Sequence, residues 1–102
     1  MAQFVLTNQA KNDLITIGRY TAEKWGREQR NVYLAHIDEA FHMLATGVSR
    51  GKNCDEVRLG YRKQKVGSHI IFYRPAENQF IEIVRILHER MDPERHIQSD
   101  DS

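Results

Sequence analysis

Histidine and cationic side chains gather in the last third of the sequence. The run Arg85–Asp92 reads RILHERMD and is followed by Arg95 and His96. Histidine is the side chain best suited to proton transfer near neutrality, and arginine and lysine can stabilise negative charge as it develops. Further groups of the same kind precede this run, at Lys63, Lys65 and His69. These residue types allow acid–base chemistry without a metal, or equally a charged contact surface.

Metal and nucleotide chemistry have little support in the sequence. His36 and His42 are six residues apart, which is not the i, i+4 spacing that places two ligands on one helix face. Cys54 is the only cysteine, so an internal disulfide and a cysteine-rich metal site are excluded, and we expect an unreactive thiol. No glycine-rich loop precedes a predicted helix, so phosphate-loop and dinucleotide motifs are missing. We therefore predict neither a metal nor a cofactor.

Apolar periodicity in the first half predicts the elements that would position these groups. Residues 8–25 have the spacing of an amphipathic helix, with its inner face formed by Ala10, Leu14, Ile17, Thr21 and Trp25. Thr7 or Asn8 would cap this helix, and Gly26 in a left-handed conformation would close it. A second helix follows and ends at Gly47, with a stripe formed by Tyr33, Ile37, Ala40, Phe41 and Leu44. Because almost no loop separates them, the two helices must lie roughly antiparallel.

The remaining segments have the composition of strands and turns. Residues 4–6 could form an edge strand, and residues 48–55 have the composition of a loop. Four further strands are expected at 56–59, 61–66, 68–74 and 79–87, with a turn over Pro75–Asn78 between the last two. We expect one domain over residues 1–97 and a mobile polar tail over 98–102. The predicted fold class is α+β, an N-terminal helical hairpin packed on a small, mainly antiparallel sheet.

Composition and charge narrow the environment and the partners. The chain is 40% apolar and 28% charged, as in a soluble globular protein, and no apolar run could span a bilayer. The first residues lack the pattern of a signal peptide, so we expect a cytoplasmic protein that does not engage membranes. The net charge of +1 hides an asymmetry, since residues 47–75 carry a net +5 and residues 76–102 a net −4. The basic segment is either a surface for an acidic partner or nucleic acid, or a solvated strand face.

The chain resembles the ParE branch of the RelE/ParE superfamily, the toxins of bacterial toxin-antitoxin pairs. Fragments in the order found in that group carry the resemblance: Leu6-Thr7, Ala10, Asp13-Leu14, Ile17, Trp25-Gly26, Gly60-Tyr61-Arg62, Gly67–Tyr73 and Arg85–Asp92. Each fragment alone is weak, but they span nearly the whole chain. The resemblance implies the RelE/ParE fold, in agreement with the predicted element order.

The resemblance implies a toxin that acts on DNA gyrase by binding. ParE-like toxins are held to trap gyrase with its DNA cut, which requires only that the toxin bind the cleaved complex better than the resealed one. A rigid charged surface suffices for this, and no catalytic residue is needed. The residues expected to carry gyrase binding and toxicity are Arg85, His88, Glu89, Arg90, Met91 and Arg95.

An alternative hypothesis is that the chain is a metal-independent endoribonuclease that cuts messenger RNA on the ribosome, as RelE-like members of the superfamily do. Its site would comprise His69, Arg90 and His96. The ribonucleases typically carry an arginine in the strand that holds His69, and His69 stands where that arginine is expected. This departure favours the binding function, while His96 keeps the alternative open.

The family also implies an antitoxin of the ParD type, in a hetero-oligomer with the toxin. Its disordered arm would fold onto the toxin beside the first helix, near Leu14, Ile17, Tyr20, Trp25 and Tyr33. Core packing is the alternative explanation for these apolar residues, and for Trp25 it is the favoured one. We expect no sequence-specific nucleic-acid binding by the toxin alone. An inactive relative that only binds its antitoxin is a third alternative.

Overall fold

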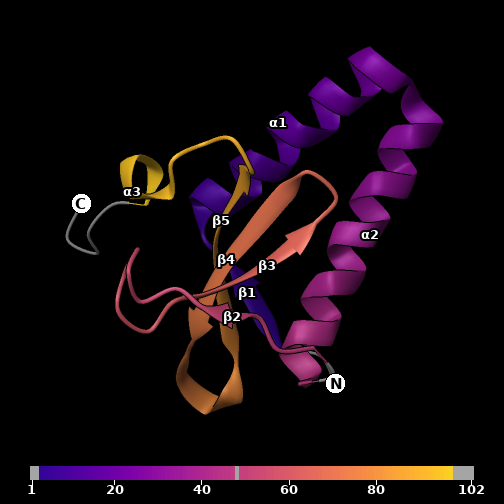
Figure 1. The fold of residues 1–102 in the computed structure, drawn as a ribbon. Coiled ribbons are helices and arrows are strands. Elements are labelled where there is room, and N and C mark those ends of the chain that lie inside the picture. Colours follow the sequence, from indigo (N-terminus) through magenta and orange to yellow (C-terminus); the bar gives the residue numbers. More distant parts are fainter. Residues whose placement is uncertain (1–2, 48, 98–102) are drawn as a thin grey trace.

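The computed structural model describes residues 3–47 and 49–97, which form two helices packed against a five-stranded sheet (Figure 1). The elements in chain order are β1 (Phe4–Leu6), α1 (Asn8–Trp25), α2 (Arg27–Thr46), β2 (Lys52–Asn53), β3 (Arg62–Val66), β4 (His69–Pro75), the 3-10 turn η1 (Glu77–Gln79), β5 (Ile81–His88) and α3 (Pro93–His96). The predicted α+β class, with a helical hairpin on a mainly antiparallel sheet, is confirmed. The predicted tail at 98–102 lies outside the described residues.

The two long helices begin and end where the sequence indicates. Thr7 caps α1, because its side-chain oxygen accepts a hydrogen bond from the Ala10 amide. Gly26 has φ 95° and ψ 166°, so it is not in the left-handed helical conformation expected of it. Its extended ψ turns the chain at once into α2, whereas Gly47 closes α2 in the left-handed conformation. A single residue therefore joins the two helices, which form the hairpin at the upper right of Figure 1.

The sheet has the order β1-β5-β4-β3-β2, with only the β1–β5 pair parallel. A β-bulge shifts the register between Phe72 and Tyr73 of β4, so that Tyr73 pairs with Ile83 and Phe72 with Arg85. Val84 is thus the extra residue of β5. After it, the side chains of β5 resume their alternation with the opposite phase.

Both faces of the sheet are covered by apolar side chains. The helix-facing core contains Ile37, Phe41, Ile71, Ile83 and Ile86 among its buried members. On the opposite face a smaller core contains Cys54, Tyr61, Phe72, Val84, Leu87 and Ile97. The second core is covered by the segment between β2 and β3 and by the end of α3, both at the left of Figure 1. Cys54 is fully buried there and burial raises the pKa of its thiol, in keeping with the expected unreactive residue.

The predicted strand at residues 56–59 is wrong, because these residues form a turn. The Asp55 carboxylate accepts a hydrogen bond from the Gly60 amide at 2.8 Å, and the Asp55 amide donates to the Asn53 side chain at 2.9 Å. These side-chain bonds compete with strand pairing. Val57 packs into the second core while Leu59 is 84% exposed. The alternation of apolar and polar residues in this part of the sequence therefore belongs to a turn and does not indicate a strand.

Smaller differences concern the strand ends. The predicted loop at 48–55 contains the two-residue strand β2, and Pro75 belongs to β4 rather than to the turn. The next strand begins at Ile81 because η1 extends the connection. A one-turn helix, α3, follows Asp92, whose side chain caps it. No helix in the described ranges is long and apolar enough to cross a bilayer.

Candidate functional site

An open groove, made of two adjoining pockets that share three residues, runs between the helical hairpin, the start of β4 and the end of β5. Its hairpin half, of about 570 Å³, is lined by Thr21, Lys24, Trp25, Gln29, Tyr33 and Ser68 together with Tyr20, His69 and His88. Its strand half, of about 430 Å³, shares those last three residues and adds Asp13, Thr16, Ile17, Arg85, Ile86, Leu87, Met91 and His96. We name the whole feature the histidine groove. It brings together residues predicted separately for antitoxin binding, target binding and RNA cleavage.

A hydrogen-bonded cluster holds the centre of the histidine groove. The Tyr33 hydroxyl lies 2.6 Å from His69 Nδ1 and 3.2 Å from the Val66 carbonyl oxygen, and it accepts from the Ser68 amide at 3.2 Å. This close approach needs a glycine at the β3–β4 turn, since a Cβ on Gly67 would lie 2.6 Å from the Tyr33 ring. The turn and α2 are therefore fixed to each other through Tyr33.

Burial lowers the pKa of the His69 imidazole, and the neighbouring His88 lowers it further. The two rings meet edge to face with centroids 5.3 Å apart. The Asp13 and Glu89 carboxylates act in the opposite direction but more weakly. The neutral imidazole is thus the favoured form near neutrality, and Tyr33 can donate to its Nδ1.

An ion pair joins α1 to β5 at the strand half of the groove. Arg85 donates to both Asp13 carboxylate oxygens, at 2.8 and 2.9 Å, and to the His96 carbonyl oxygen at 2.8 Å. Asp13 also accepts from the Ile86 amide. The exposed fractions of the two side chains are only 16% and 14%. Arg85, predicted to contact a target, therefore has its guanidinium engaged within the protein, where it fixes α1 and α3 to β5.

The other predicted target-binding residues lie at the end of β5, in the turn that follows it and in α3, a segment over residues 88–95 that we call the projecting turn. Glu89, Arg90, Met91 and Arg95 are exposed, and His88 is half-buried. His88 Nδ1 accepts from the Arg90 amide at 3.1 Å, which shapes the turn. The Glu89 carboxylate meets Lys65 Nζ at 3.0 Å, and this bond lowers the pKa of Glu89. The turn is therefore held by contacts with the sheet while its tip stays in solvent.

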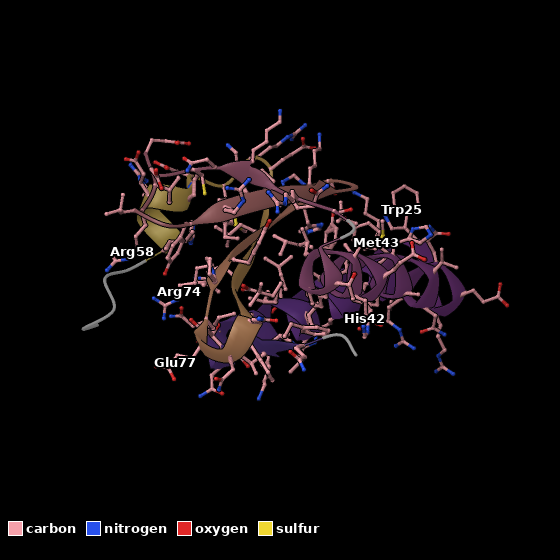
Figure 2. All side chains as sticks on the ribbon, turned by 90° about the horizontal axis from the view of Figure 1, so that it is seen from below. Trp25, His42, Met43, Arg58, Arg74 and Glu77 are labelled. Atoms are coloured by element: carbon pink, nitrogen blue, oxygen red, sulfur yellow. The ribbon has the colours of Figure 1, made fainter. Side chains whose placement is uncertain are left out.

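The residues predicted to bind an antitoxin fall into two groups. Ile17, Tyr20, Trp25 and Tyr33 line the histidine groove. Tyr20 is 55% exposed and Trp25 66% exposed, so core packing does not explain Trp25, while Ile17 belongs to the core. Seen from below, Trp25 lies beside the helices on one side of the molecule, and Arg58, Arg74 and Glu77 lie on the other side (Figure 2).

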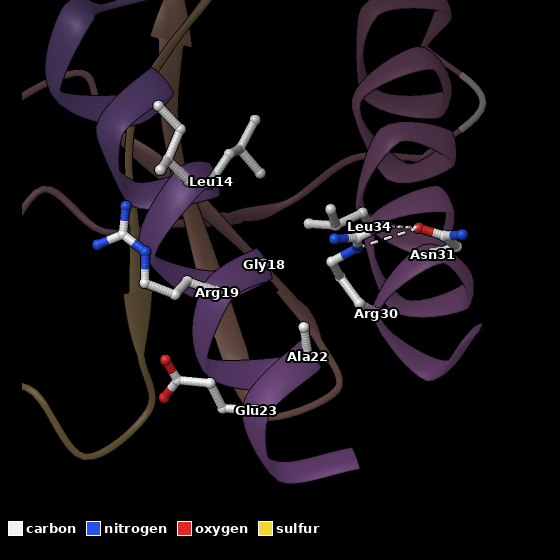
Figure 3. A pocket seen from close by; sticks show the side chains of 9 residues that line it. Leu14, Gly18, Arg19, Ala22, Glu23, Arg30, Asn31 and Leu34 are labelled. Carbon is white, nitrogen blue, oxygen red and sulfur yellow. Dashed lines mark hydrogen bonds between the residues drawn. The ribbon is translucent and has the colours of Figure 1, made fainter. Parts of the chain in front are cut away.

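Leu14 faces a second groove, which runs between α1 and α2 (Figure 3). Gly18 and Ala22 of α1 lie opposite Leu34 and Arg30 of α2 in that groove. The helices approach closely at Gly18, where a Cβ would lie 3.3 Å from the Leu34 side chain. Arg30 donates to the Asn31 side chain. The exposed Ile15 adds an apolar rim.

The three residues of the alternative ribonuclease site are only partly brought together. His69 and His96 both line the strand half of the histidine groove. Arg90 does not line either half. Within residues 3–47 and 49–97, no group of three or more His, Cys, Asp or Glu side chains could hold a metal ion.

Two structural features of the histidine groove were not predicted from the sequence. Asp13 was visible only as a helix residue, because its partner Arg85 is 72 positions away. Ser68 contributes its backbone amide rather than its side chain. Neither feature leaves a periodic signal that a single sequence could reveal.

Comparison with known proteins gives consistent matches over nearly the whole chain. A family model described as "ParE toxin of type II toxin-antitoxin system, parDE" matches residues 4–93. Toxin ParE1 of Mycobacterium tuberculosis is 38% identical over 96 residues, covering 94% of this chain and 98% of the relative. Toxin ParE1 of Caulobacter vibrioides is 34% identical, covering 95% and 99%. Toxin ParE of Escherichia coli is 35% identical, covering 90% and 89%.

A solved structure shares the fold. A chain of the chromosomal ParDE TA system from P. aeruginosa superposes with a TM-score of 0.70 at 21% identity. The match covers 86% of this chain and 96% of that one. The arrangement of helical hairpin and sheet is therefore common to the two proteins.

Proposed function

The chain belongs to the ParE toxin family of type II toxin-antitoxin systems, and on that premise we propose that it poisons DNA gyrase and is neutralised by a ParD-type antitoxin. The poisoning requires binding alone. The toxin would bind gyrase with its DNA cut more tightly than gyrase with its DNA resealed, and so hold the break open.

The projecting turn is the observation that carries this proposal. It presents Glu89, Arg90, Met91 and Arg95 to solvent on a base fixed by the Asp13–Arg85 ion pair. A contact surface that is ordered before binding loses less conformational entropy on association. We assign gyrase contact to the exposed residues and to His88, and a positioning role to Arg85.

The histidine groove supports the antitoxin half of the proposal. Tyr20 and Trp25 offer exposed aromatic surface, which an amphipathic helical arm could cover. The same groove reaches Met91 and His88 at the base of the projecting turn. An antitoxin arm seated there would contact the turn and block its access to gyrase.

The ribonuclease alternative has weaker support. Its cation, Arg90, lies outside the groove that His69 and His96 share, and the Arg85 guanidinium is already paired with Asp13. Cleavage of RNA needs a cation close to the phosphate to stabilise the transition-state charge. The binding function makes no such demand.

A DNA-cleavage assay tests the proposal. Purified toxin is incubated with gyrase, ATP and supercoiled plasmid, and protein is then digested away. Linear DNA is expected to accumulate with the toxin and to disappear when the antitoxin is added first. If gyrase is unaffected while translated messages are cut in a ribosome-containing reaction, the ribonuclease function replaces this one.

Charge reversal locates the contact surface. Arg90→Glu is expected to abolish linear DNA without altering thermal unfolding, because Arg90 is exposed. Arg27→Glu is the matched control, an exposed arginine at the start of α2 and far along the chain from the turn. Equal activity of the two variants would remove Arg90 from the proposed surface.

Antitoxin binding is tested separately by calorimetry. The double variant Tyr20→Ala/Trp25→Ala is expected to weaken antitoxin binding by more than about 2 kcal/mol, as buried aromatic anchors do. Gyrase poisoning by this variant should persist and need about thirtyfold more antitoxin, or more, for its neutralisation. Unchanged antitoxin affinity would place the arm elsewhere, with the groove between α1 and α2 as the next site to test.

A further inference from the structure

Two lysines lie directly opposite each other at the β2 edge of the sheet. The antiparallel pairing of β2 with β3 sets Lys52 against Lys63. Directly paired residues point to the same face of a sheet, and Lys65, two residues along β3, shares that face. The same face carries Ile70 and Phe72, which pair with Lys65 and Lys63. The three lysines form a strip on the side away from the long helices, which we call the lysine strip.

Contacts of Gly51, the residue before β2, fix the strand register that places Lys52 opposite Lys63. The Gly51 amide donates to the Tyr73 hydroxyl at 2.7 Å, and the Arg62 guanidinium donates to the Gly51 carbonyl. A side chain at position 51 would clash, since a Cβ there would lie 2.4 Å from the Lys63 carbonyl oxygen. The chain before β2 is therefore pressed against β3, and the lysines cannot separate by a shift of the strand.

Like charges directly opposite in a ladder oppose strand pairing. The positive charge of Lys65 is balanced by the Glu89 carboxylate, which lies 3.0 Å from Lys65 Nζ. Among the residues that the structure describes, no acidic side chain forms such a pair with Lys52 or Lys63. An anionic ligand would remove the repulsion, so the strip is suited to a ligand that carries several negative charges in a row.

We propose that Lys52 and Lys63, together with Lys65 when it exchanges the Glu89 carboxylate for a phosphate, bind the phosphate backbone of duplex DNA without regard to sequence. The part this plays in toxicity rests on the proposed function: the strip would grip the DNA segment that gyrase has cut. Lysines two residues apart on a strand are separated by about 7 Å, which lets them reach different phosphates of one strand. Lysine binds phosphate as a point charge on a flexible stem, and it does not enforce a single geometry.

The charge distribution favours DNA over an acidic protein as the occupant. A protein interface of useful affinity needs aromatic or arginine anchors at its centre, and the strip consists of lysine alone. Base-specific readout needs bidentate side chains in a groove, which the strip also lacks. Backbone binding requires only cations at a suitable spacing.

Fluorescence anisotropy with a labelled 30-base-pair duplex, without gyrase, tests the proposal. Three phosphate contacts predict that the logarithm of the association constant falls with the logarithm of salt concentration with a slope of about −2.7. Lys52→Gln/Lys63→Gln is expected to reduce the slope to about −0.9 and to weaken binding roughly tenfold or more at 50 mM salt. Lys11→Gln/Arg27→Gln removes two exposed cations from the helices and is expected to leave binding within about twofold of the unsubstituted protein.

Several outcomes overturn the proposal. No binding at about 100 µM protein in low salt would do so, as would equal losses in the two double variants. Binding to a polyglutamate probe with the same dependence on Lys52 and Lys63 would show a general anion site instead of a DNA site. Thermal unfolding guards against misfolding, because removal of the opposed charges is expected to keep or raise Tm.

A gyrase assay then separates this proposal from the proposed function. The Lys52→Gln/Lys63→Gln variant is expected to need at least about fivefold more protein to yield the same linear DNA, in line with its loss of backbone contacts. If the unsubstituted protein binds DNA through the strip but never poisons gyrase, the proposed function fails and the strip stands. If it poisons gyrase and the variant binds duplex DNA equally well, only the strip is refuted.

Discussion

The two faces of the sheet are closed in different ways. On one face, α1 and α2 together supply a regular apolar surface around Ile37 and Phe41. On the other face, a turn and the end of a one-turn helix cover Phe72 and Leu87. Regular elements bury their residues along a repeating stripe, whereas irregular segments bury single residues such as Val57 and Ile97. We therefore expect the helices on the first face to unfold only when the whole protein unfolds. The turn and α3 on the second face are expected to open locally, at a lower free energy.

A matched pair of substitutions gives the largest expected effect. Ile37→Ala, at a fully buried site on the helix side, is expected to lower the free energy of unfolding by about 3–4 kcal/mol. Ile97→Ala should cost only about 1–2 kcal/mol, because the short segment that carries it can relax into the space. Urea unfolding measures both, and equal losses would contradict the contrast between the faces.

The Asp13–Arg85 ion pair connects the two faces, and its loss ranks next. Asp13→Asn is expected to cost about 2–3 kcal/mol, less than for a fully buried pair because the carboxylate retains some solvent contact. Hydrogen exchange should quicken in α3, since Arg85 also holds the His96 carbonyl. Asp38→Asn, which alters an exposed pair with His42, serves as control with a change under about 0.5 kcal/mol. Unchanged exchange in α3 would show that α3 is held by Ile97 alone.

The smallest expected effect concerns the pH dependence of stability that His69 contributes in the histidine groove. Because the folded state lowers the pKa of His69, the unfolded chain takes up the proton first as pH falls. The contribution of His69 to the free energy of unfolding is fully present above the unfolded-state pKa of about 6.5. It declines as the pH falls below that value toward the lower pKa of the folded state. His69→Gln should therefore lose less stability between pH 7.5 and 5.5 than His36→Gln does, by a fraction of a kcal/mol. An identical pH dependence in both variants would contradict the role of burial.

Elements with a strong local signal were predictable from the sequence. Helices α1 and α2 follow from the spacing of Ala10, Ile17, Ile37 and Phe41, and from glycines at their ends. The β4–β5 hairpin followed from its apolar composition. In each of these cases the pattern repeats over several turns or residues, so a single exception does not hide it.

The features that the sequence missed depend on contacts between distant residues. Asp55 and Gly60 fold residues 56–59 into a turn although Val57 and Leu59 alternate as in a strand. Arg85 lies among exposed charged residues in the sequence, yet Asp13 on α1 draws it inward. Trp25 resembles a core residue by its spacing, but it is the last residue of α1, where it lines an open groove and stays 66% exposed. Tertiary context decides these positions, and periodicity cannot supply it.

The bulge at Val84 sets the phase of everything that follows it in β5. Ile81 and Ile83 face the helices before it, and Ile86 faces them after it, a step that strict alternation would forbid. If the same eight residues of β5 alternated strictly, with no bulge, Leu87 would face the helices and His88 would leave the histidine groove. The bulge thus takes up one residue without turning it into a change of face, and so decides which side the end of the strand presents. Deletion of Val84 would let Ile83 and Arg85 pair as neighbours with Tyr73 and Phe72, so Leu87 and His88 would keep their faces in a strand without a bulge.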